Sequence, residues 1–142
     1  REVLREYYVL VEGHFNHQHA HVDAPIGRDP QNRQKMKVTH INAKEARTDF
    51  FAEEIYDDLS LLVARLDTGR THQIRLHSLF MELPVLGDDL YGSGEIEELE
   101  GQGLHAYHLA FDHPITGEKM EFFTEIPKRF ERVLRKVRSE KA

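Results

Sequence analysis

A polar segment at residues 68–77 carries the side chains of this sequence that are best suited to chemistry. It reads Thr-Gly-Arg-Thr-His-Gln-Ile-Arg-Leu-His, and it follows an apolar run, Leu59–Leu66, that is typical of a strand. After Thr68-Gly69 the pattern changes to that of a helix. The start of a helix presents unpaired backbone N–H groups, and together with Arg70 and Arg75 these groups suit a phosphate or a carboxylate. We therefore expect an anionic partner.

The composition indicates one soluble globular domain. The 142 residues fit a single domain, and 39% hydrophobic and 31% charged residues are typical of a globular protein. The sequence has no cysteine, which excludes disulfides and thiolate metal sites. It shows no apolar run of membrane length and no signal peptide, so we expect no membrane association and a cytoplasmic location.

The formal net charge of −6 argues against a general polyanion-binding protein, because non-specific affinity depends on how many phosphates are neutralised. The charge is unevenly distributed, however. Residues 24–37 are rich in turn formers and are predicted to form a long exposed loop. This loop carries four cations that we expect to contact phosphates: Arg28, Arg33, Lys35 and Lys37.

Four histidines lie within eight residues, from His14 to His21. Neutral imidazole suits zinc, copper or nickel, but no carboxylate lies among them, and Asn16 favours a turn. We predict a solvated hairpin here and no metal. A histidine-rich metal protein is the alternative, and it requires stoichiometric zinc.

Five segments are predicted to be strands: 5–13, 44–56, 59–66, 104–111 and 119–123. The first has apolar residues on both faces, so we place it centrally in a sheet. The other four pair as two antiparallel hairpins, joined at the turn-forming residues Asp57-Asp58 and Pro114–Gly117.

Two helices complete the predicted fold. The first follows the strand that ends at residue 66, buries a stripe of Leu76, Phe80 and Leu83, and ends at Pro84. The second is opened by Pro127. The fold class is therefore α+β, a mostly antiparallel mixed sheet with a few packed helices.

The polar segment, with Pro84–Asp88 and Tyr91-Gly92 after it, strongly resembles the RNA pseudouridine synthases of the RluA and RluD type. Other stretches agree in order: Tyr7–Gly13, Ala24–Arg28, Lys44–Phe50, Leu104–Ala106 and His113–Glu118. The resemblance covers nearly the whole chain. It implies an enzyme that isomerises uridine in RNA to pseudouridine without a cofactor, after taking the nucleotide out of the stack.

The resemblance also implies roles by position. Tyr7 is similar to the tyrosine that packs against the flipped base and has been considered a proton acceptor. Arg75 is similar to the arginine that keeps the catalytic aspartate ionised, and Leu104 to an apolar residue of the pocket. The implied partner is RNA, ribosomal or transfer. Its expected contacts, besides the four loop cations, are Arg70, His72 and Gln73.

One part of the family pattern has no counterpart here. The attacking aspartate lies in an Arg-Leu-Asp motif upstream of the tyrosine strand, and in this sequence that strand begins at residue 5. Arg65-Leu66-Asp67 looks similar, but it directly precedes the polar segment, and the serine that follows the motif is missing. We expect residues 1–142 to be the C-terminal portion of a catalytic domain whose N-terminal half carries the aspartate, and to be inactive alone.

Three further expectations follow from the resemblance. Glu82-Leu83-Pro84 stands where Gly-His-Pro is usual, which leaves the end of the helix open. A sheet without its remaining strands exposes an edge, which favours self-association. The competing function is a non-catalytic RNA-binding module of the same fold, with salt-dependent RNA affinity and no isomerase activity.

Overall fold

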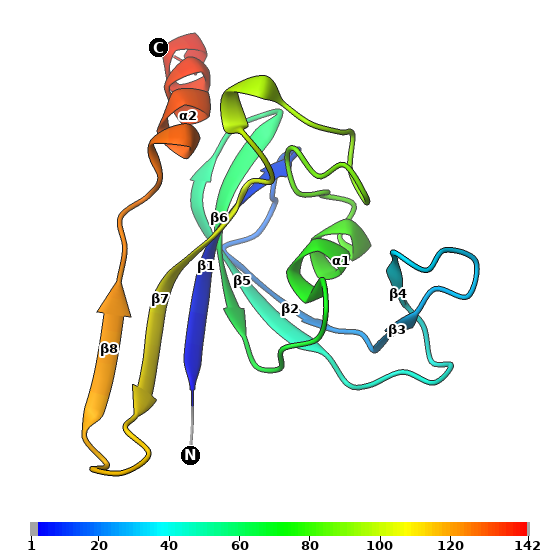
Figure 1. The fold of residues 1–142 in the computed structure, drawn as a ribbon. Coiled ribbons are helices and arrows are strands. Elements are labelled where there is room, and N and C mark those ends of the chain that lie inside the picture. The colour runs from blue at the N-terminus through cyan, green and yellow to red at the C-terminus, as the bar shows by residue number, and fades with distance from the viewer. Residues whose placement is uncertain (1–2, 142) are drawn as a thin grey trace.

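A computed structural model describes residues 3–141 of the chain. Its centre is a six-stranded antiparallel sheet with the strand order β2-β5-β6-β1-β7-β8 (Figure 1). These strands are β1 Leu4–Glu12, β2 His19–Asp23, β5 Arg47–Ile55, β6 Leu59–Leu66, β7 Leu104–Asp112 and β8 Lys119–Phe123. The predicted α+β class with a mostly antiparallel sheet is confirmed.

The helices lie on opposite faces of this sheet. Helix α1 (Gln73–Phe80) packs on one face, and α2 (Lys128–Lys141), together with the short 3-10 helix η1 (Glu97–Leu99), packs on the other. No helix in this part of the chain is both long and apolar enough to span a bilayer. The sheet is thus a central layer with helices on both of its faces.

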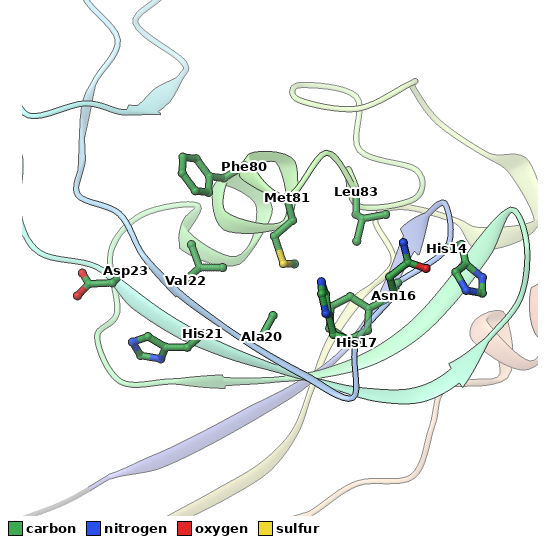
Figure 2. A pocket seen from close by; sticks show the side chains of 11 residues that line it. His14, Asn16, His17, Ala20, His21, Val22, Asp23, Phe80, Met81 and Leu83 are labelled. Carbon is green, nitrogen blue, oxygen red and sulfur yellow. The ribbon is translucent and has the colours of Figure 1, made fainter.

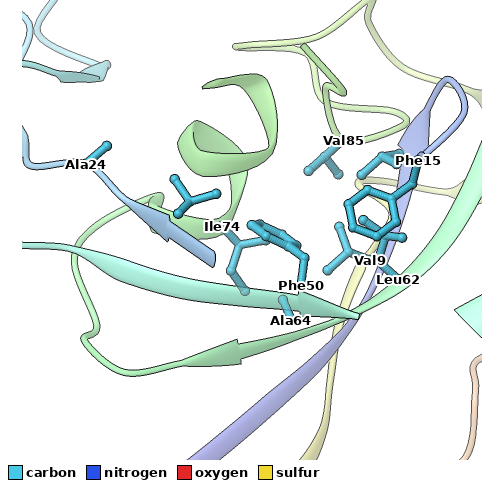
Figure 3. Packing of buried hydrophobic residues seen from close by; sticks show 10 residues of the cluster. Val9, Phe15, Ala24, Phe50, Leu62, Ala64, Ile74 and Val85 are labelled. Atoms are coloured by element: carbon cyan, nitrogen blue, oxygen red, sulfur yellow. The ribbon is translucent and has the colours of Figure 1, made fainter. Parts of the chain in front are cut away.

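Strand β1 is central, as predicted, because its side chains alternate between two cores. Val9 and Val11 point into the cluster beneath α1, while Leu10 points into the cluster beneath α2, and all three are fully buried. Figure 3 shows the first cluster, in which Ile74 of α1 meets Phe50 of β5 over the sheet. The sheet is therefore anchored on both sides of β1.

Both predicted hairpins are present. Strands β5 and β6 pair across Asp57-Asp58, and β7 and β8 pair across the turn at Pro114–Gly117. Strand β8 is an edge of the sheet, and its Phe122 and Phe123 are 51% and 64% exposed. The backbone on the outer side of β8 has no strand partner in the described part of the chain.

The prediction of a long exposed loop at residues 24–37 is partly wrong. Strands β3 (Ile26–Arg28) and β4 (Met36–Val38) pair as a small separate sheet. Ile26 also bonds in both directions with the backbone of Lys44. The segment between β3 and β4 is exposed, as expected, but its two ends are fixed.

The prediction for α1 is also partly wrong. The helix ends at Phe80 rather than at Pro84, and Phe80 is 58% exposed, whereas Leu76 is buried. Glu82 has φ +65°, and the backbone N–H groups of Glu82 and Leu83 bond to Leu79 and Ser78. This is a Schellman ending, in which the chain turns through a left-handed residue, a position where glycine is usual. The helix is therefore shorter than predicted, and most of its buried residues are polar.

Candidate active site

Three predicted site residues from different elements line one pocket. Tyr7 comes from β1, Arg75 from α1, and Leu104 from the start of β7. The pocket has a volume of about 230 Å³, below the ~300–1,000 Å³ usual for drug-sized ligands, so it suits a group as small as one nucleobase. We call it the Arg75 pocket. Its lining residues are Tyr7, Leu66, Arg70, His72, Gln73, Ile74, Arg75, Gln102 and Leu104.

Arg75 is held by a buried carboxylate. Its Nε and Nη2 donate to Oδ2 and Oδ1 of Asp88, both at 2.8 Å, in a bidentate pair. Asp88 is fully buried, and its Oδ1 also accepts the backbone N–H groups of Leu90 and Tyr91. Burial raises the pKa of Asp88, but the hydrogen bonds from Arg75 and the two N–H groups outweigh it, so the pKa is lowered. Nη1 of Arg75 has no hydrogen-bond partner among residues 3–141 and can bind another acceptor.

Tyr91 connects the pocket to the small β3–β4 sheet. Its hydroxyl accepts the backbone N–H of Met36 at 2.8 Å and lies 2.8 Å from Nδ1 of His72, within hydrogen-bonding distance. The pKa of His72 is lowered by burial and by the charge of Arg75, which fits a neutral ring that accepts at Nδ1. The guanidinium of Arg75 lies 5.0 Å from the centre of the Tyr91 ring.

Gln73 faces inward, and a contact between this residue and RNA stays a prediction. Its residue surface is only 3% exposed, and all four hydrogen-bonding positions of the amide are filled. Oε1 accepts from the hydroxyl of Thr68 and the backbone N–H of Arg70, and Nε2 donates to the carbonyl of Arg47 and the hydroxyl of Thr48. The amide therefore holds the turn before α1 against β5.

The same internal network continues through His77. Thr48 is fully buried and lies 2.8 Å from Nδ1 of His77, and Nε2 of the ring lies 2.9 Å from the carbonyl of Ala24. A carbonyl only accepts, so Nε2 donates and Nδ1 accepts the Thr48 proton. Burial lowers the pKa of His77, which favours this neutral form. Much of the polar segment is thus structural rather than exposed to a partner.

The predicted loop cations surround the β3–β4 sheet. Arg28, Arg33 and Lys37 are exposed, and Lys35 places its Nζ 5.9 Å from the centre of the Tyr91 ring. That ring also faces Arg75, so one aromatic group contacts both the loop and the pocket. Contact of these four cations with RNA stays a prediction.

Arg70 is half-buried, and its Nε donates to the carbonyl of Glu45 at 2.7 Å. This bond fixes the guanidinium at the edge of the Arg75 pocket, on the side of the turn before α1. A contact between Arg70 and RNA therefore also stays a prediction, as does one made by His72.

The histidine-rich segment does not form the predicted hairpin. Residues 14–18 are a loop, and β2 begins at His19 and pairs with β5 rather than with β1. His19 and His21 both bond to Asp49, whereas His14 bonds to the carbonyl of Tyr56. Among residues 3–141, no three His, Asp or Glu side chains are grouped so as to hold a metal ion.

A larger hollow of about 610 Å³ lies between this segment and the end of α1 (Figure 2). Phe80, Met81 and Leu83 face it from one side, while His17, Ala20 and Val22 face it from the other. It contains neither Tyr7 nor Arg75. Its size therefore does not make it the candidate site, because the residues suited to the expected chemistry line the smaller pocket.

Asp88 and Thr48 are site residues to which the sequence assigned no role. Asp88 was visible only as part of Pro84–Asp88, a stretch shared with the family pattern, and nothing local indicated its pairing with Arg75. Thr48 lies in a predicted strand with no motif around it. A carboxylate after a glycine turn, as at Gly87-Asp88, was the one signal in the sequence.

The α+β fold and the pocket that Tyr7 and Arg75 line are those expected from the resemblance to RNA pseudouridine synthases. The comparison with known families supports this class. Residues 1–79 match the model of the RNA pseudouridylate synthase family, which is more than half of the chain. The chain belongs to this family.

Individual relatives support the same assignment. The chain is 41% identical over 138 residues to an uncharacterized RNA pseudouridine synthase of Bacillus subtilis, YlyB. The aligned region covers 97% of this chain and 45% of that protein. It is 39% identical over 140 residues to ribosomal large subunit pseudouridine synthase D of Vibrio cholerae, covering 89% of this chain and 43% of that protein. The chain therefore spans less than half the length of these relatives.

A solved structure has the same fold. Human RNA pseudouridylate synthase domain containing 1 superposes with a TM-score of 0.78 at 25% identity, over 96% of this chain and 66% of that chain. The arrangement of β1, α1 and β7 around the pocket thus belongs to a known fold.

Proposed function

We propose that this chain forms the tyrosine–arginine part of the uridine site of an RNA pseudouridine synthase. The observation that carries the proposal is that Tyr7, Arg75 and Leu104, from three separate elements, line one pocket of nucleobase size. In this proposal the base of an unstacked uridine enters the pocket and packs against Tyr7, with Leu104 on its apolar side. Arg75 acts next to the sugar.

The attacking carboxylate comes from another part of the protein in this proposal. Within the described residues, the lining of the Arg75 pocket contains no aspartate or glutamate. Asp67, the one nearby candidate from the sequence, is 58% exposed and bonds to Arg47. Residues 1–142 are then the C-terminal portion of the catalytic domain, with the aspartate in the N-terminal half.

Arg75 is prepared to receive that carboxylate. Asp88 occupies two of its three nitrogens and fixes the plane of the guanidinium, which leaves Nη1 in a set direction. Because Asp88 cancels the charge of Arg75, the pair is neutral overall. An incoming aspartate is therefore stabilised mainly by a directed hydrogen bond from Nη1, and less by attraction to a net positive charge. Asp88 is a positioning residue in this scheme.

The substrate in this proposal is RNA, ribosomal or transfer. Ribosomal RNA is favoured by the name of the Vibrio cholerae relative. A cytoplasmic location is consistent with such a substrate. Self-association through the outer side of β8 is a further proposal, supported by its exposed phenylalanines.

The test is tritium release from RNA labelled at C5 of uridine, which accompanies formation of the new carbon–carbon bond. We expect no release by the 142-residue chain and release by a longer chain that includes an upstream Arg-Leu-Asp motif. Turnover by the 142 residues alone would refute the assignment of the carboxylate. RNA binding without release by the longer chain would support the non-catalytic RNA-binding module instead.

A further inference from the structure

Among residues 3–141, the charge of Arg5 has no partner. It lies in β1, two residues before Tyr7 and on the same face of the strand, about 6.8 Å away along it. Its Nε is buried and has no hydrogen-bond partner among residues 3–141, and no ion pair within this range involves Arg5. A buried N–H group of a guanidinium without an acceptor is costly. The Nη groups of Arg5 also have no partner in this range and are not buried, so a ligand can supply an acceptor to them.

Arg5 lines a second hollow, of about 500 Å³, which we call the Arg5 pocket. Its lining residues are Val3, Leu4, Arg5, Asp49, Arg65, Leu66 and Asp67. Each of the other three charged residues of this lining has a hydrogen-bonded partner, either an oppositely charged side chain or a pair of histidines. The partners are His19 and His21 for Asp49, Arg47 for Asp67, and Glu6 for Arg65. Arg5 is therefore the cation of this lining that has no carboxylate partner among residues 3–141, which favours an anionic ligand.

The position of the Arg5 guanidinium depends on a glycine in the polar segment. A Cβ atom added to Gly69 would lie 2.8 Å from Nη1 of Arg5. The guanidinium therefore packs closely against the bare Cα of Gly69, directly before Arg70. The turn that precedes α1 thus supports Arg5 on one side and the Arg75 pocket on the other.

The two pockets adjoin, because Leu66 lines both of them. The Arg75 pocket has apolar walls formed by Tyr7, Ile74 and Leu104, whereas the walls of the Arg5 pocket are largely charged. A nucleotide has the same two parts, an apolar base and a charged backbone. The adjoining pair fits one nucleotide and the phosphate beside it.

We propose that Arg5 binds the RNA phosphate next to the uridine whose base enters the Arg75 pocket. This inference rests on the proposed function, because it takes RNA as the ligand. A guanidinium suits a phosphate, whose oxygens accept two parallel hydrogen bonds. The phosphate bonds to the Nη groups of Arg5, which have no hydrogen-bond partner among residues 3–141.

The test measures binding of the 142-residue chain to a short single-stranded RNA that contains one uridine, at several salt concentrations. Arg5→Gln should weaken binding by about ten- to hundredfold and reduce the slope of log affinity against log salt by about 0.7. The matched control is Arg135→Gln, which removes the same charge from an exposed position on α2, at the far end of the molecule. It should leave affinity and slope nearly unchanged.

Two further arms separate the phosphate from other causes. RNA with uncharged methylphosphonate linkages on both sides of the uridine should bind the wild-type chain more weakly than unmodified RNA does. Arg5→Gln should bind the two RNAs with equal affinity. Gly69→Ala, which keeps every charge and displaces the guanidinium of Arg5, should weaken binding in the same direction as Arg5→Gln. Thermal unfolding confirms that each variant is folded.

The outcomes are distinguishable. If the wild-type chain and the longer protein both fail to bind RNA, the proposed function and this inference fail together. If they bind and Arg5→Gln behaves like Arg135→Gln, only the inference is overturned, and Arg5 pairs with a protein carboxylate instead. A loss that is the same for charged and uncharged linkages also overturns it.

Discussion

Replacing Asp88 with asparagine should strongly destabilise the protein. Three hydrogen bonds reach Oδ1, from Arg75 Nη2 and from the backbone of Leu90 and Tyr91, and one reaches Oδ2, from Arg75 Nε. An asparagine oxygen can keep the first three. Its NH2 group would then face Nε of Arg75, donor against donor, and the buried guanidinium would lose its counter-charge.

Breaking a buried ion pair from one side costs about 3–5 kcal/mol. For a chain of this size, that lowers the melting temperature by roughly 10–20 °C. The matched control is Asp89→Asn, the same chemical change at the adjacent, exposed residue, which should change stability by less than about 0.5 kcal/mol. Thermal and urea unfolding followed by circular dichroism measure both variants.

The pH dependence supplies a second readout for the same variant. Because the pKa of Asp88 is lowered in the folded state, its contribution is present above the unfolded pKa of about 3.9 and is lost as the pH falls through the lower folded value. The difference in the free energy of unfolding between wild type and Asp88→Asn should therefore become smaller at acidic pH. Equal stability of Asp88→Asn and Asp89→Asn at neutral pH would refute the proposed role of the buried pair.

Three further predictions concern stability. Glu82→Gly should raise the free energy of unfolding by about 1 kcal/mol because it relieves the left-handed φ, while Glu82→Ala should not; equal effects in urea titrations would contradict this. Burial lowers the pKa of His77, so wild-type stability should fall as the pH drops below about 6.5, and His77→Gln should flatten that acid limb of the urea-derived curve. The hydrogen bond that His108 donates to the Glu6 carboxylate raises the pKa of His108, so stability from this contact should be present below about pH 6.5 and lost as the pH rises through the folded value. A His108→Gln curve of stability against pH that is parallel to wild type there would exclude this contribution.

The sheet was predictable because its signals are local. Strand β1 has apolar residues on both faces, and the paired aspartates at 57–58 mark a turn between two apolar runs. Residues 26–28 and 36–38 gave no such signal, because strands of three residues are too short to show alternation. Ile26 also forms a bridge with Lys44, 18 residues later in the sequence, and no local pattern shows this contact.

The site was predictable in part, because residue type alone does not tell which polar groups point inward. The motif correctly brought Tyr7, Arg75 and Leu104 to one pocket, although their roles stay predictions. It did not reveal that Gln73 is buried and saturated, since glutamine is usually exposed. The pairing of Arg75 with Asp88 joins residues on opposite sides of a helix end, so only the folded chain shows it.

The end of α1 shows a related limit. Pro84 was a sound stop signal, but the helix ends four residues earlier, because Glu82 adopts a conformation that non-glycine residues seldom enter. Leu83, the next residue, packs against the buried cluster that includes Ile74, which favours this turn. No propensity of Glu82 itself indicates it.

The most direct test of the uridine pocket compares two neighbouring tyrosines in the longer chain. Tyr7 lines the Arg75 pocket, whereas Tyr8 points to the other face of the sheet and stacks on Tyr107 at 4.1 Å. Tyr7→Phe should reduce tritium release from C5-labelled uridine RNA by about a hundredfold or more, as expected for loss of a proton-transfer group. Tyr8→Phe should leave the rate near that of wild type. Equal rates for the two variants would contradict the assignment of the pocket.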